Sequence, residues 1–492
     1  MLKSTPTFPE FHLQTLHRKP RTAQQKLSDE LAVLKQKSFA QLGEAFGGFI
    51  PDSLLTPAAS GSHSRCRLYS KNNTFWAFMG QMFSDDGSCQ EVVQKLKAYA
   101  ALRGLDLPSS NTASYCNARS KLPIKSLIAI QGHIAGSMEQ IGANDLWHGH
   151  RVIVVDGTGV SMPDTESNQQ VWPQQRHQKP GCGFPSMRLS ACFSLHTGAL
   201  LSYREGNKHS HELTRLRDQM ETFRPGDILL GDKAFCGYRD ICDRQSKGVE
   251  TVASMSRRMP VTEAEAIRKL GADDLVIRWR RPKKVAGLSS ERVKELPPYL
   301  LLRQIKITVT EPGFRSQTIY LVTTLLDPDK YPALDLADLY FRRWDVELFF
   351  RDIKTVMGMD ILRCKTPAMI RKELLMYFIA YNCIRRIMYE AAEEADMPVR
   401  LVSFKTSLQT LRSWEPNLNQ TRLSRRERFR LITMLYASIT QNPIRQRPGR
   451  SEPRAVKRRR RNYHLLTKPR HEMHVPSHRN RNWENKYRRA LS

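Results

Sequence analysis

The stretch Arg151-Val-Ile-Val-Val-Asp156 is a β-branched apolar run that ends in an acid, and Asp227-Ile-Leu-Leu-Gly-Asp232 repeats the pattern. Short apolar runs of this kind, bounded by turn residues, are typical of buried strands. The chain between and after them alternates strand-like and helix-like segments, which predicts an α/β fold with a mixed sheet covered by helices. The strand-like segments are 188–198 and 199–206, joined by a Thr-Gly hairpin turn, and 249–256; the helix-like ones are 210–223 and 237–248.

Composition divides the rest of the chain around this region. Residues 1–145 are predicted to be a helical N-terminal region, and the α/β pattern covers 146–256. Strand signals continue through 257–330 and indicate a β-rich insertion. A long helix is predicted from Pro332 to near Gly358, with apolar helices to about 440.

The N-terminal region contains a pair of predicted helices. Ser88-Cys-Gln-Glu91 is a capping box before a helical run, and 112–122 forms a second run after the break at Pro108-Ser-Ser-Asn111. Two short helices with basic residues on the second are compatible with a helix-turn-helix DNA reader and equally with plain helical packing.

The charge balance favours a polyanionic partner. The 492 residues include 78 Lys and Arg against 48 Asp and Glu, a net charge of +30, and nucleic acid is the first candidate for such an excess. Residues 441–492 form a basic tail in which 16 cations face 3 acids, 16 − 3 = +13, and include the block Lys457-Arg-Arg-Arg-Arg461. Such a block is attracted to phosphates, although a solvating tail without a partner is the alternative.

Other function classes are disfavoured. No apolar run approaches the ~18 residues of a membrane-spanning helix, and the first residues lack the apolar block of a signal peptide. The nine cysteines are odd in number and contain no CxxC pair, which argues against a disulfide framework or a zinc module.

Asp156 and Asp232 are candidates for chemistry because both are predicted to end strands and to precede small-residue turns. Ligands gather at the carboxyl ends of strands in open sheets. Two carboxylates on adjacent strands repel each other unless a divalent cation bridges them. The alternative is that each acid only forms a turn or caps a helix.

The predicted helix 332–358 carries a third acid between two cations. At ~100° per residue the directions of four side chains fall within a stripe about 60° wide, whereas Asp345 and Asp352 point away from it. In such an arrangement the carboxylate can coordinate a metal ion while the flanking cations bind phosphate. An ordinary ion pair on a solvated helix face is the alternative. The stripe consists of Tyr340, Arg343, Glu347 and Lys354.

The spacing of these four residues resembles the YREK signature of the insertion sequence 4 family of DDE transposases. Asp156 in VIVVDGTGVSMPDT and Asp232 in LLGDKAFCGYRDI precede it in order and resemble the first and second catalytic-acid motifs of that family. The resemblance covers roughly 40–440. It implies an RNase H-like catalytic core, with its first part in 146–256 and its second part in 331–440, interrupted by the insertion at 257–330.

The resemblance also implies roles for the residues. Asp156, Asp232 and Glu347 would be catalytic and hold two Mg²⁺ ions, for which Mn²⁺ can substitute. Tyr340, Arg343 and Lys354 would bind the phosphates and the distorted transposon end. Tyr320, on the last inserted strand, would stack on a flipped base, although a strand tyrosine also serves ordinary sheet packing.

The function implied is cut-and-paste DNA transposition: strand cleavage at terminal inverted repeats and transfer of the 3′-OH ends into target DNA. The helical region 1–145 would recognise the repeats, a homodimer would pair the two ends, and the protein would be cytoplasmic and nucleoid-associated in a bacterium. The alternatives are a metal nuclease of the same fold without strand transfer and a catalytically silent, transposase-derived DNA-binding protein. The presence of all three acids and of Tyr340, Arg343 and Lys354, which would bind the transposon end, favours transposition.

Overall fold

The structure is a computed structural model. It describes residues 4–5, 8–12, 49–57, 60–63, 68–102, 106–176, 178–255, 266–309, 317–418, 424–444, 466–469 and 472–473. The chain forms two compact units, Met1–Ser126 with Arg412–Leu431 and Leu127–Leu411 with Ile432–Ser492. The basic block at 457–461 lies outside the described residues, so the predictions that rest on it are not addressed by the structure.

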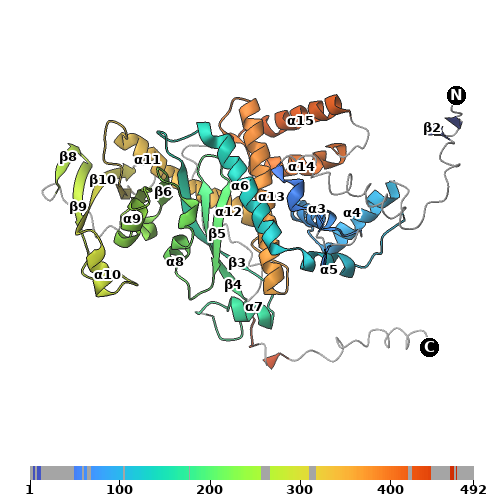
Figure 1. The fold of residues 1–492 in the computed structure, drawn as a ribbon, viewed down its shortest axis with the longest axis horizontal. Helices are drawn as coiled ribbons and strands as arrows, with labels where there is room; N and C mark the ends of the chain where they lie inside the picture. The colour runs from blue at the N-terminus through green and yellow to red at the C-terminus, as the bar shows by residue number, and fades with distance from the viewer. Residues whose placement is uncertain are drawn as a thin grey trace. The chain divides into compact units, whose positions relative to one another are not determined.

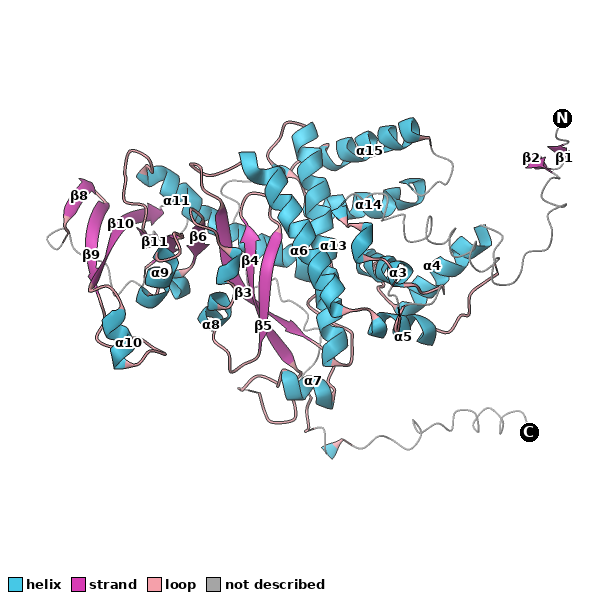
Figure 2. Ribbon diagram, viewed as in Figure 1, coloured by secondary structure: helices cyan, strands magenta, loops and turns pink. Residues whose placement is uncertain are grey.

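The second unit is built on a nine-stranded mixed sheet, drawn as magenta arrows in Figure 2. Its strand order is β5-β4-β3-β6-β7-β11-β10-β9-β8, in which β3 and β7 each pair in parallel with β6. The α/β fold with a mixed sheet, expected from the sequence, is therefore present. The strands are β3 (Val152–Ser161), β4 (Ser186–Ser194), β5 (Leu200–Gly206), β6 (Ile228–Gly231), β7 (Glu250–Ser254), β8 (Arg268–Gly271), β9 (Asp274–Arg280), β10 (Tyr299–Val309) and β11 (Gln317–Thr323). A separate pair, β1 (Ser4–Thr5) and β2 (Phe8–His12), belongs to the first unit.

Helices accompany both faces of this sheet. In the second unit they are α6 (Ile124–Ile141), α7 (Glu166–Val171), α8 (Glu212–Arg217), α9 (Tyr238–Gln245), α10 (Ser290–Glu295), α11 (Ala333–Phe341), α12 (Asp345–Arg351) and α13 (Pro367–Glu394). Figure 1 shows α6 and α13 side by side, and the Arg386 guanidinium of α13 donates to the Ser137 hydroxyl of α6 over 2.9 Å. No helix among the described residues is long and apolar enough to cross a membrane.

The alternation of side chains along β3 and β4 builds a core on each face. On one face, Ile153 and Val155 pack with Leu216 of α8. On the other face, the Phe193 ring of β4 lies 5.5 Å from the Phe349 ring of α12 and 6.2 Å from the Tyr381 ring of α13. The centre of the sheet is thus enclosed by α8 on one side and by α12 and α13 on the other.

The segment predicted as the β-rich insertion contains strands β8 to β11 and the short helix α10. These strands do not form a sheet of their own. β11 pairs with β7 through Leu321 opposite Ser254, so the inserted strands extend the same sheet. Arg303 of β10 is almost fully buried and donates to both carboxylate oxygens of Asp274 and to the Tyr331 carbonyl. This contact ties the inserted strands to the start of α11.

Two expectations about regular elements need correction. Asp156 does not end its strand, because β3 continues to Ser161 and pairs with β4 along that whole length. The expected long helix 332–358 is also not one regular helix. α11 passes into a 3₁₀ turn at Arg342–Trp344, then into α12, and then into a π-helical segment at Asp352–Val356. Gly358, with φ of +86°, ends the segment in the left-handed conformation that favours glycine.

The first unit is helical. Its helices are α3 (Lys71–Phe83), α4 (Cys89–Leu102) and α5 (Ala113–Lys121), and α14 (Phe404–Leu418) and α15 (Arg425–Thr440) contribute to both units. Ser88 accepts the Glu91 N–H over 3.1 Å, which is one half of the predicted capping box. Arg119 of α5 points inward: it donates to the buried Gln81 and lies 4.8 Å from the Phe78 ring centroid. This basic residue serves helical packing.

Candidate active site

Asp156 lies in the middle of β3 on the face that α12 covers. Its position alternates with Val154 and Thr158, whereas Gly157 faces α8. The Gly157 N–H donates to the Asp156 carboxylate over 2.7 Å. The side chain is therefore held close to the backbone of the strand that carries it.

Asp232 stands level with Asp156 on the neighbouring strand. The parallel register pairs Val152 with Ile228 and Val154 with Leu230, and two further steps along each strand lead to the two aspartates. β6 ends at Gly231, so β3 has no β6 partner at this level, although it stays paired with β4, and both acids lie where the pairing between β3 and β6 stops. The Asp232 carboxylate caps a 3₁₀ turn by accepting the Ala234 N–H over 2.7 Å.

The irregular segment between α11 and Gly358 brings further charges to this place. Arg343 lies in the 3₁₀ turn and Glu347 in the first turn of α12. Burial raises the pKa of Asp156, and the hydrogen bond from the Gly157 N–H lowers it. Of the nearby charges, those of Asp232 and Glu347 raise this pKa and that of Arg343 lowers it. Asp156, Asp232, Glu347 and Arg343 therefore form one electrostatic cluster, with Asp156 at its centre.

The other members of the predicted stripe differ in their surroundings. The Lys354 ammonium donates to the Thr158 hydroxyl over 3.0 Å, and Thr158 shares the face of Asp156 two residues along β3. Tyr340 is buried, with its ring 6.5 Å from that of Phe341. Tyr320 lies on β11 and packs against a hydrophobic cluster that includes Tyr238 of α9. A role for Tyr320 in base stacking stays a prediction.

Arg343 is unusual for an arginine in a predicted active site because it is only 8% exposed. Its guanidinium carbon lies 4.3 Å from the centroid of the exposed Trp344 ring, and its buried Nε has no hydrogen-bond partner among the described residues. The side chain is thus packed in place near the acids instead of extending freely into solvent.

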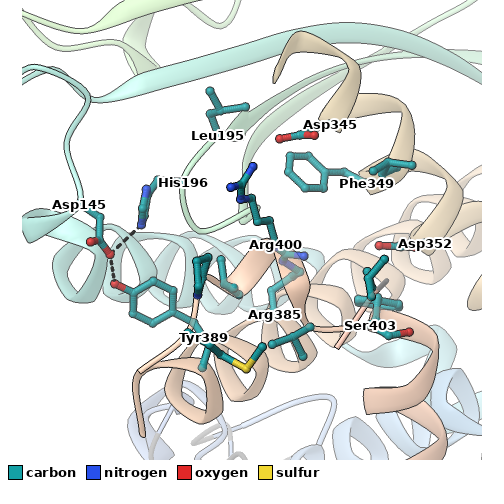
Figure 3. A pocket seen from close by; sticks show the side chains of 18 of the residues that line it. Asp145, Leu195, His196, Asp345, Phe349, Asp352, Arg385, Tyr389, Arg400 and Ser403 are labelled. Carbon is teal, nitrogen blue, oxygen red and sulfur yellow. Dashed lines mark hydrogen bonds and ion pairs between the residues drawn. The ribbon is translucent and has the colours of Figure 1, made fainter. Parts of the chain in front are cut away.

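The two aspartates excluded from the stripe face a different place. Asp345 and Asp352 line a cavity of about 700 Å³, together with Arg385 and Arg400 (Figure 3). Arg342 also lines this cavity. Burial raises the pKa of Asp345, and the neighbouring Arg342 lowers it. Residues of one helical segment therefore serve two sites: Arg343 and Glu347 act on Asp156, and Asp345 and Asp352 belong to the cavity.

One acid of the cluster was missed by the sequence interpretation. Burial raises the pKa of Glu212, in the first turn of α8, and the charges of Asp156 and Asp232 raise it further, whereas Arg215 and Arg188 lower it. The only sequence signal was an acid in a predicted helix directly after the third strand, and a helix-start glutamate is too common to single out.

The acids are a suitable donor set for a hard divalent cation, since Mg²⁺ prefers carboxylate oxygens. The buried Oε1 of Glu212 has no hydrogen-bond partner among the described residues, and the raised pKa of Asp156 reflects burial beside like charges. Within the described part of the chain, no group of three or more His, Cys, Asp or Glu side chains is already closed around a point that a metal would occupy. The residues fit the ion chemically and would need to draw together around it.

Comparison with known proteins agrees with the resemblance seen in the sequence. Residues 147–383 match the model of the transposase DDE domain family, a range that contains Asp156, Asp232 and Glu347. The transposase InsG for insertion sequence element IS4 of Escherichia coli is 27% identical over 253 residues, which are 50% of this chain and 54% of that protein. This chain therefore spans about half the length of that relative.

Two further similarities are more limited. The putative transposase InsL for insertion sequence element IS186A of Escherichia coli is 35% identical over 60 residues, 12% of this chain and 16% of that protein. Among solved structures, a piggyBac transposase synaptic complex with hairpin DNA aligns with a TM-score of 0.39 and 9% identity, over 86% of this chain and 84% of that one. Residues 147–383 thus match the transposase DDE domain across the strands and the helix that carry the three acids, and half of the chain is similar to a transposase of insertion sequence element IS4.

Proposed function

We propose that this protein cleaves DNA strands at terminal inverted repeats and transfers the resulting 3′-OH ends into target DNA. The observation that carries the proposal is the parallel register of β3 and β6, which sets Asp156 and Asp232 level on neighbouring strands where the pairing between these strands stops. Glu347 and Arg343 act electrostatically on Asp156 from the helical segment that covers this face.

We further propose that β3 to β7 form an RNase H-like core. In chain order the acids belong to the first strand (β3), to the end of the fourth (β6) and to a late helix (α12). This is the distribution that the family resemblance implies. The strands inserted between β7 and α11 would then be the β-rich insertion of the family.

Asp156, Asp232 and Glu347 would hold Mg²⁺, or Mn²⁺ in its place, as two ions. Bound there, the ions would supply Lewis acidity that makes water or a DNA 3′-OH a better nucleophile and stabilises the departing oxygen. The chain's own cations would orient the DNA. Arg343, which is buried, and Lys354, which donates to Thr158 near Asp156, would bind phosphate oxygens of the scissile strand.

DNA is accordingly the proposed partner, and the net charge of +30 supports it. The helical N-terminal region 1–145 would recognise the terminal repeats, and the basic tail 441–492 would add contacts to phosphates that do not depend on base sequence. A homodimer that pairs two transposon ends would carry out the reaction. Tyr340 would contact the distorted end, and Tyr320 would stack on a flipped base.

The test is incubation of the full chain with DNA carrying the ends of its own element and Mg²⁺, with nicked, hairpin and joined products resolved on a gel. Changing Asp156, Asp232 or Glu347 to Ala should remove cleavage and joining and leave end binding nearly intact, because the metals lower the chemical barrier and do not anchor the protein. Asp345→Ala is the matched control, since Asp345 lines the separate cavity of Figure 3.

Each contrary result has a meaning. Cleavage without any joined product would favour a metal nuclease of the same fold. Specific end binding without cleavage by the parent protein would favour a silent DNA-binding protein. Cleavage that survives Glu347→Ala and is lost in Asp345→Ala would show that the wrong side of the helical segment has been assigned to the active site.

A further inference from the structure

The fourth acid of the cluster, Glu212, lies in the first turn of α8. Its Oε1 atom is buried and lacks a hydrogen-bond partner among the described residues. A buried carboxylate oxygen left without a donor is costly, and a bound ion is one of the explanations for such a group.

The position of Glu212 depends on the glycine that follows Asp156. A Cβ atom built on Gly157 would lie 2.1 Å from Glu212 Oε1 and 2.8 Å from its carboxyl carbon. No side chain other than hydrogen leaves room for the carboxylate there. Glu212 therefore approaches β3 from the α8 face directly beside Asp156, and the absence of a side chain at position 157 permits the approach.

The arrangement has one glutamate on each side of the two strand aspartates. Glu347 comes from α12 on one face of the sheet and Glu212 from α8 on the other. Between them, Asp156 and Asp232 stand level where β3 loses its β6 partner, and all of this lies in one compact unit. The charges of Asp156 and Asp232 both act on Glu212, and the charge of Glu347 acts on Asp156.

The nearby arginines do not neutralise Glu212 through contact. Arg215 directs its NH1 group to the backbone and side-chain oxygens of Ser210, both at 2.7 Å. Arg188 lies farther along β4, with its NH1 group 3.6 Å from the place of a Cβ on Gly159. Both reduce the repulsion at long range only, and the lone oxygen of Glu212 is left for a ligand of positive charge.

Resting on the proposed function, we propose that Glu212 is a fourth carboxylate of the metal site and binds one of the two divalent ions together with the strand aspartates. The metal would supply the positive charge that the unpartnered oxygen lacks. A glutamate contributed from each face would give the site a carboxylate donor on both sides of the strand aspartates.

The experiment measures Mn²⁺ binding to the full chain by electron paramagnetic resonance and calorimetry, beside the Mg²⁺ concentration needed for half-maximal end cleavage. Glu212→Gln keeps the shape and removes the charge. We expect ~10–100-fold weaker binding of one ion, by comparison with the loss of groups that support a metal site, and a matching increase in the Mg²⁺ requirement. Melting without metal should not fall, because the substitution removes a like charge from the cluster.

Two further variants make the result specific. Gly157→Ala should push the Glu212 carboxylate away and reproduce the metal defect, and it should add little to Glu212→Gln in the double variant. Glu221→Gln is the control, since Glu221 is an exposed glutamate of the same connection, paired with Arg204. It should bind Mn²⁺ like the parent.

The outcomes separate the inference from the function on which it rests. Glu212→Gln could bind Mn²⁺ and cleave at the same Mg²⁺ concentration as the parent, while Asp156→Asn neither binds Mn²⁺ nor cleaves. This result would overturn the proposal that Glu212 is a metal ligand and leave the proposed function standing. A parent protein that neither binds Mn²⁺ nor cleaves would overturn both. If Glu212→Gln failed to fold, Gly157→Ala would decide, and unchanged metal binding in that variant would count against the proposal.

Discussion

Replacing Arg343 by Gln separates two roles that the structure gives to this side chain. Its charge lowers the pKa of Asp156, and its packed guanidinium is proposed to bind a phosphate of the scissile strand. A role in balancing charge concerns the free protein, whereas a role in holding DNA concerns only the complex. Stability and activity therefore have to be measured on the same preparation.

The expected effect on stability is small because two changes oppose each other. The substitution removes a buried Nε that lacks a partner, and relieving such a group is worth ~1–3 kcal/mol. It also removes the cation that offsets the repulsion among Asp156, Asp232 and Glu347. We expect the difference to be within ~1 kcal/mol, which corresponds to a shift in Tm of only ~1–2 °C for a unit of this size.

The expected effect on activity is large. Misplacement of the scissile strand by about 1 Å can reduce the rate ~100-fold, equivalent to ~2.7 kcal/mol in the activation free energy. Single-turnover cleavage and joining should therefore fall by about this factor in Arg343→Gln, and most for a pre-cleaved, frayed end. Binding to duplex DNA should weaken only modestly, since one of many phosphate contacts is lost.

The neighbouring Arg342 provides a matched control. Its guanidinium donates to the Leu195 carbonyl over 3.2 Å and lies 3.5 Å from Asp345, on the cavity side of the same 3₁₀ turn. Arg342→Gln should leave single-turnover cleavage near the parent rate. Full activity in Arg343→Gln with an unchanged Tm would refute the reasoning, because the guanidinium would then serve neither the DNA end nor the acids.

Two further predictions test the fold and the tail. Asp274→Ala should destabilise the protein by ~3–5 kcal/mol in chemical denaturation, because it leaves Arg303 buried without its carboxylate. Breaking the exposed pair of Lys306 and Asp273 should cost no more than ~1 kcal/mol, and equal losses at both sites would contradict this account. Deleting residues 441–492 removes the tail's charge of 16 − 3 = +13, so affinity for specific and random DNA should fall alike and the slope of log K against log salt should flatten. A selective loss of preference for the terminal repeat would instead make the tail a sequence reader.

Much of the sheet was predictable because its strands are short, apolar and separated by turn residues. The runs before Asp156 and Asp232 form β3 and β6, and the Thr197-Gly198 junction joins two antiparallel strands. The level placement of the two aspartates was not predictable, because local pattern does not set the register between strands far apart in sequence. The continuation of β3 past Asp156 was missed for a similar reason: its pairing with β4 overrides the turn preference of Asp-Gly-Thr-Gly.

Glu212 illustrates a second limit of sequence patterns. Its importance lies in a contact with Gly157, 55 positions away, and in the lack of a donor for its buried oxygen. Neither feature has a local signature. A glycine after a strand aspartate is readily assigned to a turn, and only the packing of α8 against β3 shows that the missing side chain makes room for a carboxylate.

The helical stripe was estimated from a straight helix, although the segment is not straight. The 3₁₀ turn at Arg342–Trp344 advances ~120° per residue, more than the ~100° of an α-helix, and the π-helical segment at Asp352–Val356, with its wider i→i+5 bonds, advances less. The two deviations have opposite signs and partly cancel along the segment. The ammonium of Lys354 consequently reaches Thr158 on the face of β3 that carries Asp156, while Asp352, two residues earlier, lines the cavity on the other side. A regular helix would also direct Lys354 into the stripe and Asp352 away from it, so the periodic estimate succeeds here although the regularity that it assumes is absent.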